Sequence, residues 1–175
     1  MKGYEAMYVK TKKVVYMALL TAVALIMFII EAQIPSLVPI PGAKLGLANI
    51  IIVYAMFALG PIPTFAILIC RVFMSSIFSG QMMSLLYSLG GGILCFLSML
   101  VMRKFVKINQ IWVCSVIGAI FHNIGQIIVA ILVARTIGLI IYLPVLLVSG
   151  IIAGLFTGIC AQFVVLRLPE QFKRL

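Results

Sequence analysis

The sequence predicts an all-α integral membrane protein, with one transmembrane domain over residues 1–175, about six spanning helices and both termini in the cytoplasm. Composition is the first reason, because 65% of the 175 residues are hydrophobic and only 9% are charged, with a mean hydropathy of +1.33. Soluble domains are much less apolar and carry more charge. A spanning helix uses roughly 20 apolar residues, so six would leave only short connections. The placement of basic residues between the apolar runs is the second reason.

The first apolar run predicts a helix over residues 14–34, which ends before Pro35. Lys10, Lys12 and Lys13 precede it, an order that secretory signal peptides also show. The run is longer than the apolar segment of a signal peptide, and no small-x-small cleavage site follows it. We therefore expect a retained transmembrane helix.

The next segment predicts a loop followed by a short helix. Residues 35–44 contain three prolines and a glycine, which prevent a regular helix there. A short second helix is predicted over residues 45–59. A turn that begins with Gly60 and Pro61 then leads into a third helix over residues 61–78.

The remaining chain predicts three longer helices. The fourth covers residues 82–102, and the basic link 103–107 separates it from the fifth over residues 111–134. The sixth begins at Pro144 and covers residues 144–168. Because every connection is short, no separate soluble domain fits, and we expect a single domain.

The basic residues predict the orientation of these helices, since cytoplasmic connections carry an excess of Lys and Arg. In a six-helix topology, ten of them fall on the side of the two termini: Lys2, Lys10, Lys12, Lys13, Arg103, Lys104, Lys107, Arg167, Lys173 and Arg174. Only Lys44 and Arg135 fall on the other side, and Arg71 lies within the third helix. This asymmetry predicts cytoplasmic termini in the cell membrane.

The cysteines and the histidine predict no metal site. Four cysteines lie inside apolar runs, and none belongs to a C-x-x-C pair: Cys70, Cys95, Cys114 and Cys160. We interpret them as small buried apolar side chains, neither disulfides nor metal ligands. The only histidine, His122, has no cluster of aspartates or thiolates beside it in the sequence.

Several functional classes lack their motifs. No G-x-x-x-x-G-K-[ST] sequence is present, so we expect no ATP hydrolysis by the chain itself. The sequence contains no Asp, which excludes an aspartate-rich Mg²⁺ site of the kind that binds diphosphates. The net charge of +10 lies in short clusters between apolar runs, which favours lipid headgroups over nucleic acid. We therefore expect a protein that is not an enzyme and uses no cofactor.

Polar side chains within the predicted spans are candidates for function, because ionisable groups in a bilayer are costly and usually face a bundle interior or a wet cavity. One interpretation is that Arg71 and Glu31 form a buried pair while amide side chains only join helices. The other is a polar cavity open to the outside that suits an anionic or strongly polar ligand. The side chains that would line it are Glu31, Lys44, Arg71, Ser88, His122, Asn123 and Gln126.

Small residues form two further patterns. The run Gly90–Gly92 interrupts the predicted fourth helix, and helix packing and close approach of a ligand explain it equally well. Small residues also recur at helical spacing in the sixth and first helices, where they could face an internal helix or another subunit. They are Gly150, Gly154 and Gly158 in the sixth helix, and Ala18, Ala22 and Ala24 in the first.

Three segments carry a resemblance to a known family: PGAKLGLANI at residues 41–50, SLGG at 88–91 and HNIGQ at 122–126. Together they resemble the Gx transporter family, which is often labelled heptaprenyl diphosphate synthase component I, over nearly the whole chain. That family resembles the substrate-binding S components of energy-coupling factor (ECF) transporters. The resemblance implies six helices with both termini inside.

The resemblance also implies roles for particular residues. Ala18, Ala22 and Ala24 would form the ridge that docks on the transmembrane T component, while separate ATPase subunits would hydrolyse ATP. Substrate would be bound under the proline-rich loop, between the fourth to sixth helices. The substrate-binding set is Lys44 and Arg71 for charge, Asn49, His122, Asn123 and Gln126 for hydrogen bonds, and Gly90 and Gly91 for close approach, with Glu31 and Ser88 in the cavity wall.

The first hypothesis is thus an S component that imports a small vitamin-like or isoprenoid-related compound. The alternative is a non-catalytic accessory subunit that holds an enzyme of polyprenyl diphosphate or quinone synthesis at the membrane. A membrane enzyme is a third hypothesis, and it would need a turnover that depends on His122.

Overall fold

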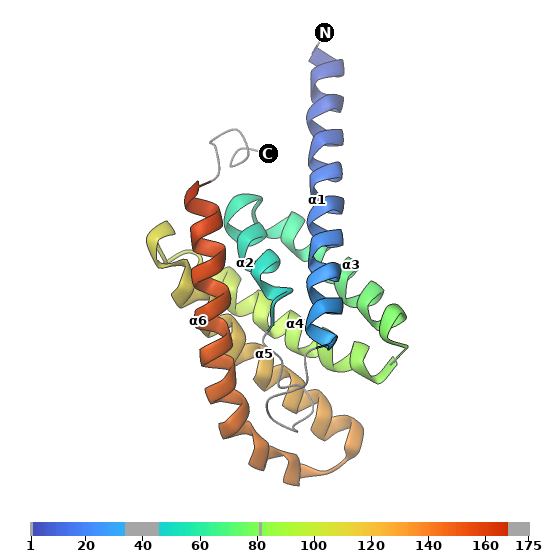
Figure 1. The fold of residues 1–175 in the computed structure, drawn as a ribbon, viewed down its shortest axis with the longest axis vertical. Helices are drawn as coiled ribbons and strands as arrows, with labels where there is room; N and C mark the ends of the chain where they lie inside the picture. Colours follow the sequence, from blue (N-terminus) through green and yellow to red (C-terminus); the bar gives the residue numbers. More distant parts are fainter. Residues whose placement is uncertain (1, 34–45, 81, 168–175) are drawn as a thin grey trace.

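The computed structural model describes residues 2–33, 46–80 and 82–167, with the backbone alone for residues 2–10. Within these ranges the chain is all-helical, as predicted, with six α-helices and two short 3₁₀ helices (Figure 1). They are α1 (Lys2–Gln33), α2 (Asn49–Ala58), α3 (Pro61–Ser79), α4 (Met82–Met102), η1 (Ile108–Gln110), α5 (Ile111–Ala134), η2 (Ile137–Tyr142) and α6 (Leu143–Arg167).

Five of the described helical segments are long and apolar enough to cross a membrane. The helix α2 has only 10 residues, which at 1.5 Å per residue is about half the hydrocarbon thickness. The predicted second helix therefore exists, but it is too short to span. It also begins at Asn49 rather than at residue 45. Gly46 adopts φ +73°, a left-handed conformation that a regular helix excludes.

The first helix begins earlier than predicted. It starts at Lys2 instead of residue 14, so the basic N-terminal segment continues the transmembrane helix. Lys is a good helix former, and a search for apolar residues does not detect a helix that continues beyond the membrane. In Figure 1, α1 extends beyond the other helices at the end that carries the N-terminus.

Glycines set the close packing of the last three helices. A Cβ added at Gly154 or Gly158 would lie 2.8 Å from the Cα of Val116 or 2.6 Å from the Cα of Trp112, both on α5. The glycine ridge of α6 therefore faces an internal helix. The run Gly90–Gly92 lies within the continuous helix α4 and does not interrupt it, contrary to the prediction.

The apolar core lies around α2, which packs against α1, α3 and α6. Its buried residues Ile52 to Met56 pack with others from α3, α4 and α5, including Ile67, Met99 and Ile111. Two of the four cysteines, Cys95 and Cys114, are buried as predicted, whereas Cys70 is exposed and Cys160 is half-buried. The interpretation of Cys70 as a buried side chain is therefore wrong.

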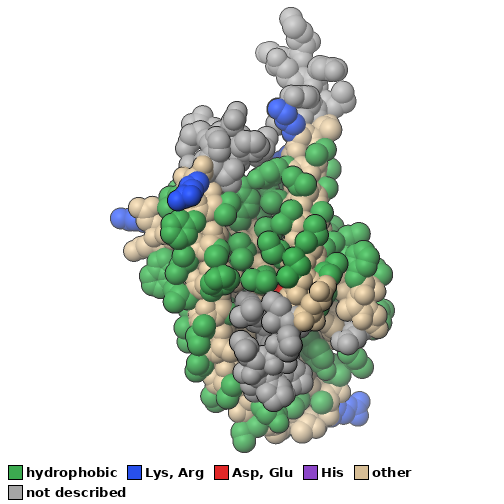
Figure 2. All heavy atoms as spheres, viewed as in Figure 1, with side chains coloured by type: hydrophobic (Ala, Val, Ile, Leu, Met, Phe, Trp, Pro, Cys, Tyr) green, Lys and Arg blue, Asp and Glu red, His purple; other side chains and the backbone are tan. Residues whose placement is uncertain are grey.

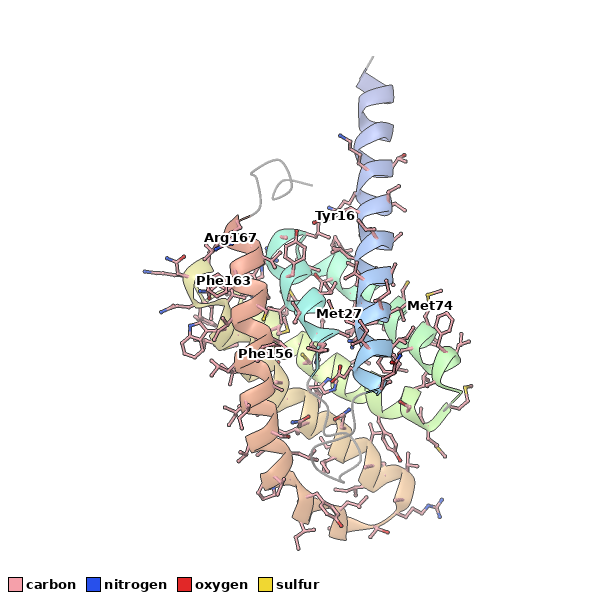
Figure 3. All side chains as sticks on the ribbon, viewed as in Figure 1. Tyr16, Met27, Met74, Phe156, Phe163 and Arg167 are labelled. Atoms are coloured by element: carbon pink, nitrogen blue, oxygen red, sulfur yellow. The ribbon has the colours of Figure 1, made fainter. Side chains whose placement is uncertain are left out.

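Hydrophobic side chains also cover much of the outer surface, as expected for helices in contact with lipid (Figure 2). The visible Lys and Arg side chains lie mainly toward the end of the molecule that carries the N-terminus (Figure 2). Arg167, at the end of α6, lies toward the same end (Figure 3). This distribution agrees with the charge asymmetry in the sequence, and the cytoplasmic position of the termini stays a prediction.

Candidate functional site

Arg71 is the buried charge in the middle of the helix α3. It lies on the inner face of that helix beside Ile67, Leu68 and Val72, and it is only 8% exposed. In Figure 3, Met27 marks the turn of α1 that precedes Glu31, and Met74 marks the turn of α3 that follows Arg71. The guanidinium therefore lies inside the helical bundle, where a charge is costly unless something compensates it.

Glu31 connects the end of α1 to the start of α2 through hydrogen bonds. Its carboxylate is 7% exposed, and its two oxygens accept the backbone N–H of Gly46 at 2.5 Å and the N–H of Leu47 at 3.0 Å. These donors precede the first turn of α2, where the positive end of a helix dipole favours a carboxylate. Glu31 thus has a structural role that the sequence did not predict.

The direct pair between Glu31 and Arg71, one of the two interpretations of the sequence, is not formed. Both Glu31 oxygens bond to backbone, and Arg71 Nε has no hydrogen-bond partner among the described residues. The two charges still lie close enough to attract each other. Arg71 is therefore an incompletely compensated cation with a free N–H donor.

His122 and Gln126 reach the same region from α5. The ring of His122 lies against Gly91 of α4 and close enough to Arg71 to interact with its charge. The ring Cε1 of His122 and the Cγ of Gln126 would each be 2.9 Å from a Cβ at Gly91. Gly91 therefore leaves room for these two side chains of α5.

Gln126 is the second residue of this region with a polar atom lacking a partner. Its Oε1 is buried, and no hydrogen bond reaches it from the described residues. We call Glu31, Arg71, His122 and Gln126 the polar centre; its residues come from α1, α3 and α5, and α4 packs against both α3 and α5. Glu31 and His122 lie close enough to Arg71 to interact with its charge, and Gln126 lies beside His122 at Gly91.

Other predicted residues have different surroundings. Asn123 is 7% exposed and donates a hydrogen bond from Nδ2 to the carbonyl of Leu146, so it ties α5 to α6. Gly90 packs against Val129 and Gly125 of α5. In both cases the observed contacts are between helices.

Three more predicted positions remain. The Nδ2 of Asn49 would lie 3.1 Å from a Cβ at Gly46, which places this side chain beside the turn that Glu31 holds. Ser88 is half-buried on α4. Lys44 lies outside the described residues.

The predicted alanine ridge on α1 does not form a single face. Ala18 and Ala22 are exposed, whereas Ala24 is 0% exposed and lies in the interior. Successive residues turn by about 100° around a helix. Ala24, two positions after Ala22, therefore lies on nearly the opposite side of α1. The prediction that Ala24 shares an outer docking surface is therefore wrong.

The predictions missed Cys95 as a neighbour of the polar centre. It lies one turn beyond Gly91 on the buried face of α4 and close enough to Arg71 to interact with its charge. Nothing in the sequence distinguishes Cys95 from the other cysteines in apolar runs. That Cys95 lies near Arg71 could be found only from the way in which α3 crosses α4.

Comparison with known proteins identifies a family. A family model described as heptaprenyl diphosphate synthase component I matches residues 20–164, a range that includes the whole polar centre. Neither a curated protein nor a solved structure matches the chain.

Proposed function

The chain belongs to the heptaprenyl diphosphate synthase component I family, and we propose that it is the substrate-binding membrane subunit, or S component, of an ECF-type importer. Its cargo would be a small polar or anionic molecule, and its location the cytoplasmic membrane. The observation that carries this proposal is the buried Arg71 with its unpartnered Nε. An arginine that served only packing would have its donors satisfied by protein groups, because an unpaired buried charge is strongly destabilising.

The position of the polar centre supports entry from the outer side. Glu31 lies near the end of α1 that is opposite to the basic N-terminus. Toward the N-terminal end, the bundle is filled by the apolar core, and Tyr16 and Tyr54 share a hydrogen bond of 2.6 Å between α1 and α2 (Figure 3). A ligand would therefore reach Arg71 from outside and be released inside only after the subunit reorients.

The energy for reorientation would come from other subunits. The sequence has no P-loop, so ATP would be hydrolysed by two separate ATPases that act through a T component. The exposed positions Ala18 and Ala22 on α1 would contribute to the T-component contact, because small residues allow two helices to approach closely.

The family description favours a second candidate, a non-catalytic accessory subunit for heptaprenyl diphosphate synthesis. A catalytic role receives less support, because the sequence contains no Asp for a Mg²⁺-diphosphate site. The two candidates differ in the soluble partner that each requires.

Native mass spectrometry of gently extracted protein tests the proposal, because it reports bound small molecules and subunits together. We expect a T component and ATPases in the complex, and a small molecule whose retention is lost in Arg71→Ala. Arg135→Ala is the control, since it removes an exposed arginine at the outer end and should leave retention unchanged. A soluble prenyl synthase in place of the ATPases would support the accessory role and contradict transport.

The docking surface is tested in the same preparation. Ala22→Leu should weaken assembly with the T component, because it adds bulk to an exposed face of α1, and it should leave ligand retention intact. If assembly is unchanged in Ala22→Leu and no ligand is found with the native protein, the S-component proposal is wrong.

A further inference from the structure

Two buried polar atoms of the polar centre have no hydrogen-bond partner among the residues that the structure describes, and the two atoms differ in kind. Arg71 Nε is a hydrogen-bond donor on a cation, and Gln126 Oε1 is an acceptor on a neutral amide. A buried polar group without a partner destabilises the folded protein, because it loses the hydrogen bonds that water would provide. A ligand that satisfied both atoms would need an acceptor with negative charge and, separately, a donor.

The two unpartnered atoms come from different helices. Arg71 lies near His122 and Cys95, while Gln126 lies one helical turn beyond His122 on the same face of α5. A ligand that contacts both atoms would therefore reach from α3 to α5.

The charge of the polar centre limits the charge of the ligand. Arg71 contributes one positive charge, and Glu31 keeps a carboxylate nearby that is held by the N–H groups of Gly46 and Leu47. Because the charges of Arg71 and Glu31 cancel, a bound monoanion would add one excess negative charge to the described residues of the polar centre. A diphosphate would leave a larger excess in a buried site without aspartates to hold Mg²⁺, which is unfavourable.

The free Nε also favours one geometry. A guanidinium can bind a carboxylate side-on through its Nε–H and one neighbouring N–H, which gives two parallel hydrogen bonds. A lysine offers a single charged point and cannot reproduce this pair.

We propose that the polar centre binds a small monocarboxylate that also carries a hydroxyl or N–H donor, with the carboxylate on the Nε edge of Arg71 and the donor on Gln126 Oε1. This assignment rests on the proposed function for the site's role in capture, and it specifies the class of cargo. The family description names a diphosphate product, so the assignment separates the cargo from that product.

Calorimetric titration of the purified protein with matched probes tests the ligand class. The probes are 4-hydroxybenzoate, benzoate and 4-hydroxybenzamide, the aliphatic series 4-hydroxybutyrate, butyrate and 4-hydroxybutyramide, and inorganic pyrophosphate. We expect at least one hydroxy acid to bind about tenfold or more tightly than its amide, which lacks the negative charge and the second acceptor oxygen opposite Arg71. The same preference is expected over the des-hydroxy analogue, which leaves Gln126 Oε1 unpaired. Pyrophosphate should bind more weakly than the hydroxy acid.

Two substitutions assign the two contacts. Arg71→Lys should weaken binding of the hydroxy acid about tenfold or more, although the charge is kept, because the side-on pair is lost. Gln126→Met should abolish the preference for the hydroxy acid over its des-hydroxy analogue and leave the analogue's affinity unchanged.

Gln162→Met is the matched control, since Gln162 on α6 also has a buried and unpartnered Oε1. It lies one turn beyond Gly158, which packs at Trp112 near the start of α5, far from the polar centre. All three variants are compared only after each is shown to elute as a monodisperse species.

Three results would overturn the inference: binding of pyrophosphate more tightly than every acid, binding of no acid in either series, or equal losses for both members of a pair in Gln126→Met. These results are distinct from failure of transport. A chain that assembles with ATPases but binds no monocarboxylate contradicts the ligand class alone. A chain that binds the acid but assembles with no ATPase contradicts transport and leaves the site intact.

Discussion

At the end of α1, one carboxylate holds two backbone donors in place, so its removal should destabilise the fold. Glu31→Ala would leave the N–H groups of Gly46 and Leu47 without their charged acceptor, at a cost of about 1–3 kcal/mol. Thermal unfolding in detergent can be followed with a thiol-reactive fluorophore, because Cys95 and Cys114 are buried in the folded protein. We expect a lower midpoint for Glu31→Ala.

Gln33→Ala is the matched control for this prediction. It truncates an exposed polar side chain on the last turn of the same helix and should change the midpoint little. Equal midpoints for the two variants would show that the Glu31 carboxylate does not stabilise the start of α2.

The polar residues of α5 show how far the role of a single side chain can be predicted from the sequence. The cavity interpretation grouped His122, Asn123 and Gln126 because all three are polar side chains within one predicted span, and residues four apart, such as His122 and Gln126, share a helical face. Asn123 is adjacent to the shared face, and the turn of about 100° directs it to α6 instead. The sequence predicted that these side chains matter, but it could not say which of them meet a neighbouring helix.

At the scale of elements, the crossing of α4 and α5 depends on glycine. A Cβ at Gly125 would lie 2.5 Å from the carbonyl oxygen of Gly90, and that atom belongs to backbone that cannot rotate away. We expect Gly125→Ala to lower the free energy of unfolding by about 1–3 kcal/mol, measured with the same fluorophore. The separation of the helices should also weaken ligand binding at Gln126.

Gly138→Ala in η2 controls for the loss of a glycine as such. A Cβ there would meet only the Cγ2 of Thr136, at the ordinary contact distance of 3.7 Å. If both alanine variants unfold at the same temperature as the native protein, the crossing tolerates a wider separation than the structure indicates.

Element boundaries were predictable where local chemistry sets them. Pro61 begins α3 and Gly80, with φ +65°, follows its end, so the predicted range of 61–78 is nearly correct. The start of α2 was not predictable in this way. It depends on Glu31, which is 15 residues earlier than Gly46 and acts across space.

For the whole molecule, the charge asymmetry predicts the topology in the membrane. In intact cells, a membrane-impermeant maleimide should label Arg135→Cys, which lies between α5 and α6 at the end that the charge asymmetry predicts to face outside. Lys104→Cys, in the link after α4, should be labelled only after the membrane is disrupted. The native chain supplies the background from its four cysteines.

The reverse pattern of labelling would invert the topology. The polar centre would then open to the cytoplasm, and capture of an external ligand would be excluded. Labelling of both positions in intact cells would show a mixed orientation and contradict the charge-based prediction.

The sequence by itself determined the class of this protein, its helices and its unusual polar residues. Apolar runs and their basic connections are local properties, because each helix must satisfy its own backbone hydrogen bonds in lipid. The glycine and proline positions ended helices for equally local reasons. The absence of Asp and of a P-loop likewise follows from the sequence alone.

Only the tertiary structure decided which of those residues meet. It assigned Glu31 to the start of α2, left Arg71 Nε and Gln126 Oε1 without partners, and turned Ala24 to the interior. These outcomes depend on how α1, α3, α4 and α5 cross, and the crossing of α4 and α5 requires the close approach of backbones at Gly91 and Gly125. Such contacts join residues far apart in the chain, so no local pattern encodes them.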